Sequence, residues 1–194
     1  MIKNIINELR ISIIATVCLA VLLCGVYPAI VWGIAQGLFH SQANGSLVLA
    51  KGQVIGSSLL AQSFTGAGYF HPRPSTAGDG YDAVSSGGSN LGPTSQKLID
   101  AVKGRTAAYR AENNLAPEVF IPADAVTASA SGLDPHISVQ NALLQARRVA
   151  GARGISEEAL RKKILSHAEG RDLGIFGEPR VNVFMLNLDM DGKQ

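Results

Sequence analysis

The sequence predicts an α+β protein in which one N-terminal transmembrane helix precedes a single exported α+β domain. Residues 11–39 contain no Asp, Glu, Lys or Arg. A helix of that length covers about 43 Å, whereas the hydrocarbon core of a bilayer is about 30 Å thick. The remaining residues contain no cysteine and mix helical periodicity with short apolar runs. We therefore divide the chain into a cytoplasmic N-terminus (1–10), a transmembrane helix (11–39) and an exported domain (40–194).

The composition excludes two broad classes of protein. Seventeen basic residues against fifteen acidic residues leave a net charge of +2 in 194 residues. Because binding to nucleic acid calls for clustered positive charge, no nucleic-acid partner is expected. Hydrophobic residues make up 46% of the chain and charged residues 16%, which does not fit an intrinsically disordered protein.

The charges that flank the apolar stretch predict its orientation. Lys3 and Arg10 precede it, and no Lys or Arg follows it until Lys51. The positive-inside rule then places the N-terminus in the cytoplasm and the domain outside. The alternative is a signal peptide that is cleaved near residues 41–43. The apolar region of a signal peptide is about 7–15 residues long, so the length favours a retained anchor.

Two features are expected within the anchor. Pro28 lacks the amide hydrogen that a helix interior requires, so we expect a kink there. Small residues recur every four positions, at Gly25, Ala29, Gly33 and Gly37. Such a row lets another membrane helix approach closely, and it predicts a helix-packing face. The alternative is that Gly and Ala are simply frequent in membrane helices.

The first half of the exported domain reads as a hairpin, a loop and a helix. Residues 46–50 and 53–58 are short apolar stretches around a turn, which predicts a β-hairpin. Residues 65–93 are rich in Gly, Ser and Pro and show no periodic apolar face. We expect a long loop there, and loops of that length are usually functional or mobile. A helix is expected after a cap at Thr94 or Ser95.

Three more elements are expected towards the C-terminus. The dipeptide Asp134-Pro135 is typical of a helix start, because Asp caps the helix and Pro fits its first position. This helix is expected to end at Gly151. Ser156 is expected to cap a third helix, which Gly170 ends. The apolar run 181–188 predicts a central terminal strand.

The sequence offers little that points to catalysis. It contains no Gly-rich phosphate-binding loop, and its four histidines share no metal-ligand spacing, so no metal site is expected. Residues 87–91 resemble the nucleophile elbow of a hydrolase without its final glycine. Ser89 is therefore a candidate nucleophile, with His71 or His136 as its base. An anchored exported hydrolase is one alternative function, and a stand-alone anchored binding module is another.

Short motifs are spread in order over nearly the whole chain. They comprise Tyr27-Pro28, residues 42–46, 68–71, 73–75, 86–91 and 126–135, Arg148-Val149-Ala150 and residues 179–182. Together they resemble the motifs of the KdpC family, the C subunits of bacterial Kdp potassium-transporting ATPases. The family architecture, one span followed by one exported domain, agrees with the prediction from hydropathy. The motif residues singled out as candidate site residues are Tyr69, His71, Arg73, Ser86, Gly87, Gly88, Asn90, Ser131, Gly132 and Asp134.

The resemblance implies a non-catalytic accessory subunit of a high-affinity potassium uptake pump in the bacterial inner membrane. The implied partners are a potassium-selective channel-like subunit, a P-type subunit that hydrolyses ATP, a small single-span subunit and membrane lipid. No tightly bound cofactor is implied, because the complex handles ATP and potassium. The subunit would help assembly and act as a catalytic chaperone that raises the ATP affinity of the hydrolysing subunit.

The family's nucleotide-contacting signature has no good match in this sequence. Residues 85–89 depart from it at the first position and at the final glutamine, so Gln145 is the glutamine that we consider for a nucleotide contact. The predicted topology conflicts with a direct contact, because ATP is cytoplasmic and residues beyond the span are outside. An effect on ATP affinity would then pass through the membrane helices, and we expect support of assembly and potassium entry to come first.

Overall fold

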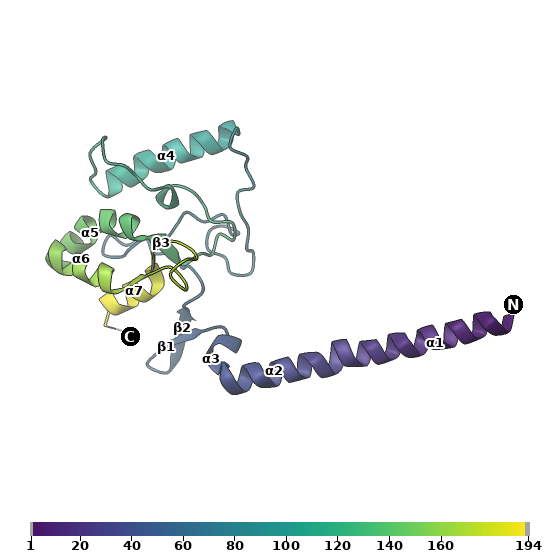
Figure 1. Cartoon of the computed structure of the whole chain (residues 1–194). Helices are drawn as coiled ribbons and strands as arrows, with labels where there is room; N and C mark the ends of the chain where they lie inside the picture. The colour runs from purple at the N-terminus through teal and green to yellow at the C-terminus, as the bar shows by residue number, and fades with distance from the viewer. Residues whose placement is uncertain (1, 193–194) are drawn as a thin grey trace. The chain divides into compact units, whose positions relative to one another are not determined.

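The computed structural model of the chain describes residues 2–192, with side chains from residue 4 onward; Lys3 and the last two residues of the predicted exported domain therefore lie outside the described side chains. The chain divides into two compact units at Leu47/Val48. The first unit is helical. The second combines helices with two small antiparallel sheets, so the predicted α+β class is confirmed (Figure 1).

The first unit contains one long apolar helix. It comprises α1 (Ile2–Ala20), a π-helical segment (Val21–Val26) and α2 (Tyr27–Leu38), followed by the short α3 (His40–Ala43). A stretch of 35 residues, Asn4–Leu38, has a mean hydropathy of 2.4 in its most apolar window and buries no part of that window, so it is long and apolar enough to cross a membrane. The helix also covers most of the segment predicted as the cytoplasmic N-terminus.

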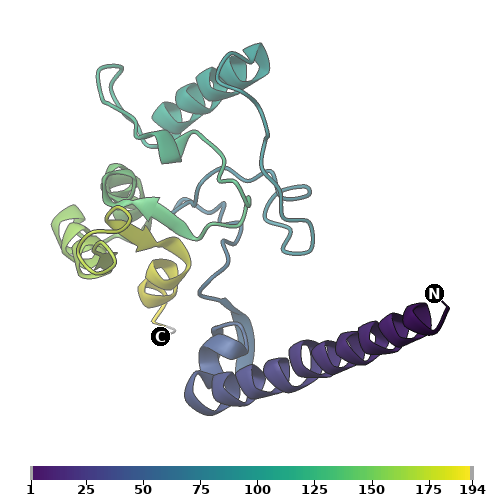
Figure 2. The same ribbon diagram turned by 45° about the vertical axis from the view of Figure 1, so that its right-hand side comes forward.

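Pro28 does not produce the kink that we predicted. Figures 1 and 2 show α1 and α2 continuing as one rod. The chain instead widens into the π-helical segment directly before Pro28, where the amide of Tyr27 donates to the carbonyl of Leu22. In a π-helical turn each backbone hydrogen bond spans one residue more than in an α-helix. The hydrogen-bond ladder can therefore pass the position where proline has no amide hydrogen, and the helix continues without a sharp bend.

The second unit opens with the predicted hairpin, formed by β1 (Leu47–Ala50) and β2 (Gln53–Ser57). Lys51 and Gly52 both adopt left-handed backbone conformations, with φ of 52° and 79°. Two left-handed residues are what a two-residue hairpin turn requires, since that turn matches the twist of the strands.

The main core is built on a three-stranded antiparallel sheet in the order β3-β5-β4, formed by His136–Ser138, Arg180–Asn182 and Ala168–Glu169. Both outer strands are in register with Val181. Three helices pack around this sheet, namely α5 (Val139–Arg153), α6 (Glu157–Ser166) and α7 (Val183–Met190). The buried cluster comprises Phe70, Ile137, Ala142, Ala146, Val149, Ala150, Leu160, Ile164, Val181, Val183 and Leu186.

A second, smaller cluster lies under α4 (Gln96–Glu112). Tyr109 packs there with Ala125 of the 3₁₀ turn Ala123–Ala125 and with Val126. Figures 1 and 2 show α4 at one end of this domain, apart from α6 and α7. The helix begins after Ser95, as predicted, but the Ser95 side chain makes no capping hydrogen bond. Residues 65–93 contain neither helix nor strand, so the long loop is also confirmed.

The predicted start of the clearest helix is wrong. Asp134-Pro135 leads into β3, and α5 begins four residues later, where the Ser138 hydroxyl accepts a hydrogen bond from the amide of Asn141. Both sites satisfy the capping rules, and the Ser138 hydroxyl, which also donates to Asp124, is the one used. The helix ends at Arg153 rather than Gly151, with Gly154 left-handed at φ 65°.

The predicted terminal strand 181–188 is also wrong, since only residues 180–182 are extended. Asn182 ends the strand and caps α7 through its side-chain oxygen, which accepts from the amide of Met185. A short apolar run does not distinguish a buried strand from a buried helix, and here the cap decides. The cap of α6 by Ser156 is confirmed, but this helix ends at Ser166 instead of Gly170.

Candidate functional site

The long loop 65–93 is attached to the core by two buried amide side chains. Asn187 of α7 accepts from the amide of Phe70 at 2.8 Å and donates to its carbonyl at 2.9 Å. Gln145 of α5 does the same for His71, accepting from its amide at 2.8 Å and donating to its carbonyl at 3.1 Å. Each amide thus replaces one rung of a sheet, and residues 70–71 are fixed without being part of a strand.

Gln145 has further partners in this network. It is 1% exposed; its nitrogen also donates to the Asn141 side chain at 3.0 Å, and its oxygen also accepts from Arg148 at 2.9 Å. The nucleotide contact that we considered for Gln145 stays a prediction. Such a contact would require the Gln145 side chain to give up these hydrogen bonds, which would leave buried polar groups without partners.

Arg148 joins the loop to two helices. Its guanidinium donates to the carbonyls of Ala67 and Tyr69 at 2.7 and 3.0 Å, and to the side chain of Asn113 at 3.0 Å. Burial lowers the pKa of this guanidinium, and the Glu112 carboxylate works in the opposite direction. Although the family motifs included Arg148, it was not among the candidate site residues.

His71 lies beside this arginine. Its Nδ1 is 2.8 Å from a carboxylate oxygen of Glu112, the last residue of α4. Burial and then the positive charge of Arg148 lower the pKa of His71, and Glu112 offsets them only in part. These effects favour the neutral form of His71. Its contact with Glu112 links the loop to the end of α4.

Tyr69 belongs to a separate contact at the C-terminal end of the domain. Its hydroxyl donates to Asp191 at 3.1 Å, and the guanidinium of Arg153 lies 4.8 Å from the centre of its ring. Arg153 also pairs with Asp191 at 2.9 Å. Ring, cation and carboxylate therefore connect the loop to the end of α5 and to the residue after α7.

A junction between two loops brings together most of the remaining motif residues. Arg73 pairs with Asp134 at 3.2 Å. The hydroxyl of Ser86 and the amide of Gly87 both donate to the carbonyl of Ser131 at 2.9 Å. Burial acts to raise the pKa of the Asp134 carboxyl, but hydrogen bonds from His136 and the charge of Arg73 outweigh it, so the pKa lies below its usual value.

The glycines of this junction allow the two loops to touch. A Cβ on Gly132, whose φ is +68°, would lie 2.7 Å from the amide nitrogen of Ala77, and one on Gly88 would lie 2.8 Å from the carbonyl oxygen of Ala130. Any larger residue would separate the loops. Asn90 is exposed and left-handed at φ 51°, where asparagine is tolerated better than most residues.

The described residues show no catalytic arrangement around Ser89. Its candidate bases are engaged elsewhere, His71 with Glu112 and His136 with Asp134 at 3.3 Å. Within the same residues, no group of three or more His, Cys, Asp or Glu side chains is placed to hold a metal ion. Most of the motif residues are engaged in hydrogen bonds and ion pairs that hold the loops together, which is the arrangement of a structural scaffold.

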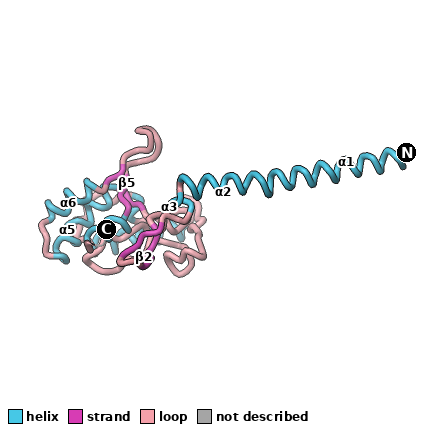
Figure 3. Tube along the Cα trace, turned by 90° about the horizontal axis from the view of Figure 1, so that it is seen from below, coloured by secondary structure: helices cyan, strands magenta, loops and turns pink. Residues whose placement is uncertain are grey.

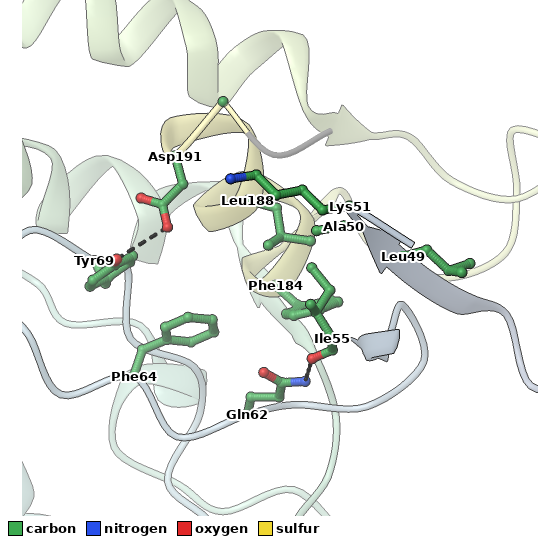
Figure 4. A pocket seen from close by; sticks show the side chains of 11 residues that line it. Leu49, Ala50, Lys51, Ile55, Gln62, Phe64, Tyr69, Phe184, Leu188 and Asp191 are labelled. Atoms are coloured by element: carbon green, nitrogen blue, oxygen red, sulfur yellow. Dashed lines mark hydrogen bonds between the residues drawn. The ribbon is translucent and has the colours of Figure 1, made fainter. Parts of the chain in front are cut away.

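A groove of about 610 Å³ lies between the hairpin and α7 (Figure 4). Its lining is mainly apolar, and Tyr69 is the motif residue that reaches it. Gln62 donates to the carbonyl of Ile55 at 3.2 Å along one side. The lining residues are Leu49, Ala50, Lys51, Ile55, Gln62, Phe64, Tyr69, Phe184, Leu188, Asp191 and Gly192.

The row of small residues in the anchor is unobstructed in this structure. A Cβ added at Gly25, Gly33 or Gly37 would meet nothing within 4 Å. Gly25 lies in the π-helical segment, whereas Ala29 and the two later glycines lie in α2. The predicted packing of another helix on this row stays a prediction.

Comparison with known proteins connects this scaffold to one family. The family model described as the c chain of the K⁺-transporting ATPase, KdpC, matches residues 9–192. The KdpC subunit of Koribacter versatilis is 51% identical over 192 residues, covering 99% of this chain and 96% of its own length. The KdpC subunit of Nitratidesulfovibrio vulgaris is 56% identical over 185 residues (94% and 92%), and that of Mycobacterium tuberculosis 58% over 166 residues (86% and 88%). The chain therefore belongs to the KdpC family of potassium-transporting ATPase subunits.

Proposed function

We propose that the chain is a non-catalytic, membrane-anchored accessory subunit that supports assembly of the potassium pump and raises the ATP affinity of its hydrolysing subunit. The observation that carries the proposal is the 35-residue apolar helix, whose most apolar part is not buried within the chain. Its side chains need lipid around them, and its row of small residues offers a face to a neighbouring helix. A tethered enzyme needs only the lipid, whereas a subunit needs both.

The roles of the motif residues support a non-catalytic function. Gln145, His71 and Arg73 are each engaged in hydrogen bonds or ion pairs that hold the long loop against the rest of the domain. A catalytic group needs a proton or an electron pair free to react, and these groups are occupied by structural partners. The domain then presents a fixed surface rather than a reactive centre.

The partners that we propose are a channel-like subunit that selects potassium, a P-type subunit that hydrolyses ATP and a small single-span subunit. The row from Gly25 to Gly37 would be the packing face for one of their helices. Helices in lipid associate through close backbone approach, because the lipid supplies no hydrophobic driving force between them.

The effect on ATP affinity would pass through the anchor. Charges around the span favour a cytoplasmic N-terminus and an exported domain, on the side away from ATP. Coupling across the membrane is possible only if the anchor packs differently in two states of the pump, so that each state biases the affinity for ATP. Direct contact between the domain and nucleotide is not needed.

The test is affinity purification of the full chain from its native membrane together with three anchor variants. Wild type should bring down larger polytopic subunits, with potassium-dependent ATPase activity only in the assembled complex. Gly33→Leu and Ala29→Leu should lower recovery of those subunits. The matched control is Ala35→Leu, about 240° around α2 from Ala29, which should not. Equal recovery from all variants would contradict the packing face.

A reporter fused after Gln194 tests the topology. Activity of the reporter only outside the cytoplasm is expected from the flanking charges. A cytoplasmic signal would refute the orientation and reopen direct nucleotide contact. Recovery of a water-soluble, unaccompanied chain that begins near Asn44 would overturn the proposed function as a whole.

A further inference from the structure

The connection between β4 and β5, residues 170–179, exposes three large apolar side chains. Leu173 is 88% exposed, Ile175 72% and Phe176 63%. In Figure 3 the loop that leads into β5 projects away from the body of the domain. Single exposed apolar residues are ordinary, but a cluster of this kind at a projecting tip marks an interaction site. We refer to residues 170–179 as the apolar loop.

The apolar loop is held in shape by backbone hydrogen bonds within its turn and by ion pairs at its base. The amide of Asp172 donates to the carbonyl of Phe176 at 2.8 Å, and the reverse bond measures 2.9 Å. Arg171 donates to both carboxylate oxygens of Glu178 at 2.9 Å, and Arg180 lies 3.3 Å from Asp172. A loop shaped in this way loses little conformational entropy when it binds.

Leu173 adopts a backbone conformation that suits a smaller residue. Its φ is 53°, in the left-handed region, and the next residue, Gly174, has φ 75°. A bulky side chain in that region carries a conformational cost that glycine does not carry. The turn would therefore be served better by glycine, and the leucine side chain has a use other than forming the turn.

We propose that the apolar loop inserts into an apolar slot with a basic rim on the exported face of another subunit of the pump. The inference rests on the proposed function, since it requires that partner subunits exist. Ile175 and Phe176 would be the buried anchors, in keeping with the small number of residues that dominate most interfaces.

The charges around the loop indicate why the partner is a protein and not lipid. Three carboxylates outnumber two guanidiniums at the base, and residues 168–180 contain no lysine. Both arginines are already paired with carboxylates of the same chain. Segments that dock on anionic lipid present unpaired Lys and Arg, which this loop lacks. The carboxylates are in these same pairs, but Glu178 and Asp172 are 79% and 66% exposed at the side chain, more than their arginine partners, so the outer surface of the loop base is acidic and complements a rim of Lys or Arg on a protein.

The first test is photo-crosslinking in the intact pump, with the full chain carrying a photoreactive residue at position 176 or, as control, at position 120. Phe120 is 73% exposed, comparable to Phe176, but lies in another loop. The expected result is a crosslink to another pump subunit from position 176 and none from position 120. A crosslink to lipid from position 176, or none although the complex is recovered intact, would overturn the inference. Failure of the wild-type chain to bring down any subunit would instead overturn the proposed function.

The second test compares Phe176→Ser with Phe120→Ser, which remove the same side chain from exposed sites. Recovery of partner subunits through a stringent detergent wash should fall by about tenfold or more for Phe176→Ser, as for an interface anchor, and should not change for Phe120→Ser. Equal recovery from both variants counts against the loop as a docking element.

Two further variants separate docking from folding. Leu173→Gly relieves the backbone strain, so the thermal stability of the isolated chain should stay or rise while recovery of partners falls; a merely structural leucine would show no such divergence. Glu178→Lys should lower recovery most at low salt, whereas Glu158→Lys should not. The two glutamates match, since each is about 80% exposed at the side chain and pairs with one cation. An equal response of both would refute the basic rim.

Discussion

The anchor and the last helix of the domain are both strongly apolar, and they show opposite burial. The central window of the span buries nothing in the chain, whereas five of the eight residues of α7 are buried. Length and neighbours explain the difference. A helix of 35 residues is about 52 Å long, more than the hydrocarbon thickness of about 30 Å, while one of eight residues is about 12 Å long and fits against the sheet. Apolar composition alone therefore does not tell a core helix from a membrane helix, whereas length together with burial does.

The sharpest way to break this comparison is to truncate a leucine in each helix. Leu186→Ala removes a side chain that is fully buried in the core, and it should lower the free energy of unfolding of the domain by about 2–5 kcal/mol. Leu22→Ala, in the span and 52% exposed, should leave that free energy unchanged. Circular dichroism during denaturation of the detergent-solubilised chain is the measurement, because the single tryptophan, Trp32, lies in the anchor and would report on the wrong unit. A comparable loss in Leu22→Ala would mean that the two units unfold together.

A smaller effect is expected from the polar residue inside α7. Asn187→Leu keeps the branching of the side chain, with a larger volume, but leaves the buried amide and carbonyl of Phe70 without partners, which costs about 1–3 kcal/mol for an unsatisfied group. Hydrogen exchange at Phe70 and His71 should accelerate as the loop detaches. Gln96→Leu, which replaces an exposed amide on α4, is the control and should change neither quantity. Unaltered exchange in Asn187→Leu would show that the loop is held by its other contacts alone.

The smallest effect is the pH dependence of the link between the loop and α4. Because burial and Arg148 hold the pKa of His71 below its usual value, the unfolded chain binds the proton more readily than the folded one. Stability should therefore fall as the pH decreases through about 6.5, the unfolded value for histidine. His71→Asn should flatten this part of the profile of unfolding free energy against pH. A slope that is the same in wild type and variant would assign the effect to other groups.

Much of the architecture followed from sequence because it depends on local rules. The span needs only a long run without charge, and the hairpin needs only two short apolar stretches around Lys51-Gly52. The α6 cap at Ser156 needs only a hydroxyl before two glutamates. In each case the signal and the structure lie within a few residues of each other, so tertiary contacts do not reverse the outcome.

The misassigned elements depend on choices that sequence leaves open. Asp134 and Ser138 are both good caps four residues apart, and the tertiary contact of Ser138 with Asp124 accompanies the second one. The run 181–188 is apolar enough for a strand or a helix. The site was predictable as a set of motifs, but the hydrogen bonds that connect them were not. In the sequence, Asn187 looks only like an interruption of an apolar run. Its partner, Phe70, is 117 residues away.

The π-helical segment in front of Pro28 has a consequence for how the anchor behaves in lipid. Since proline supplies no amide hydrogen, the turn before it holds one more carbonyl oxygen than it has backbone donors. Hydrocarbon chains cannot satisfy that oxygen, but a hydroxyl or amide on an adjacent span can. Gly25 leaves the backbone bare in the same turn. The middle of the anchor is thus the part that gains most from a polar group on a neighbouring helix.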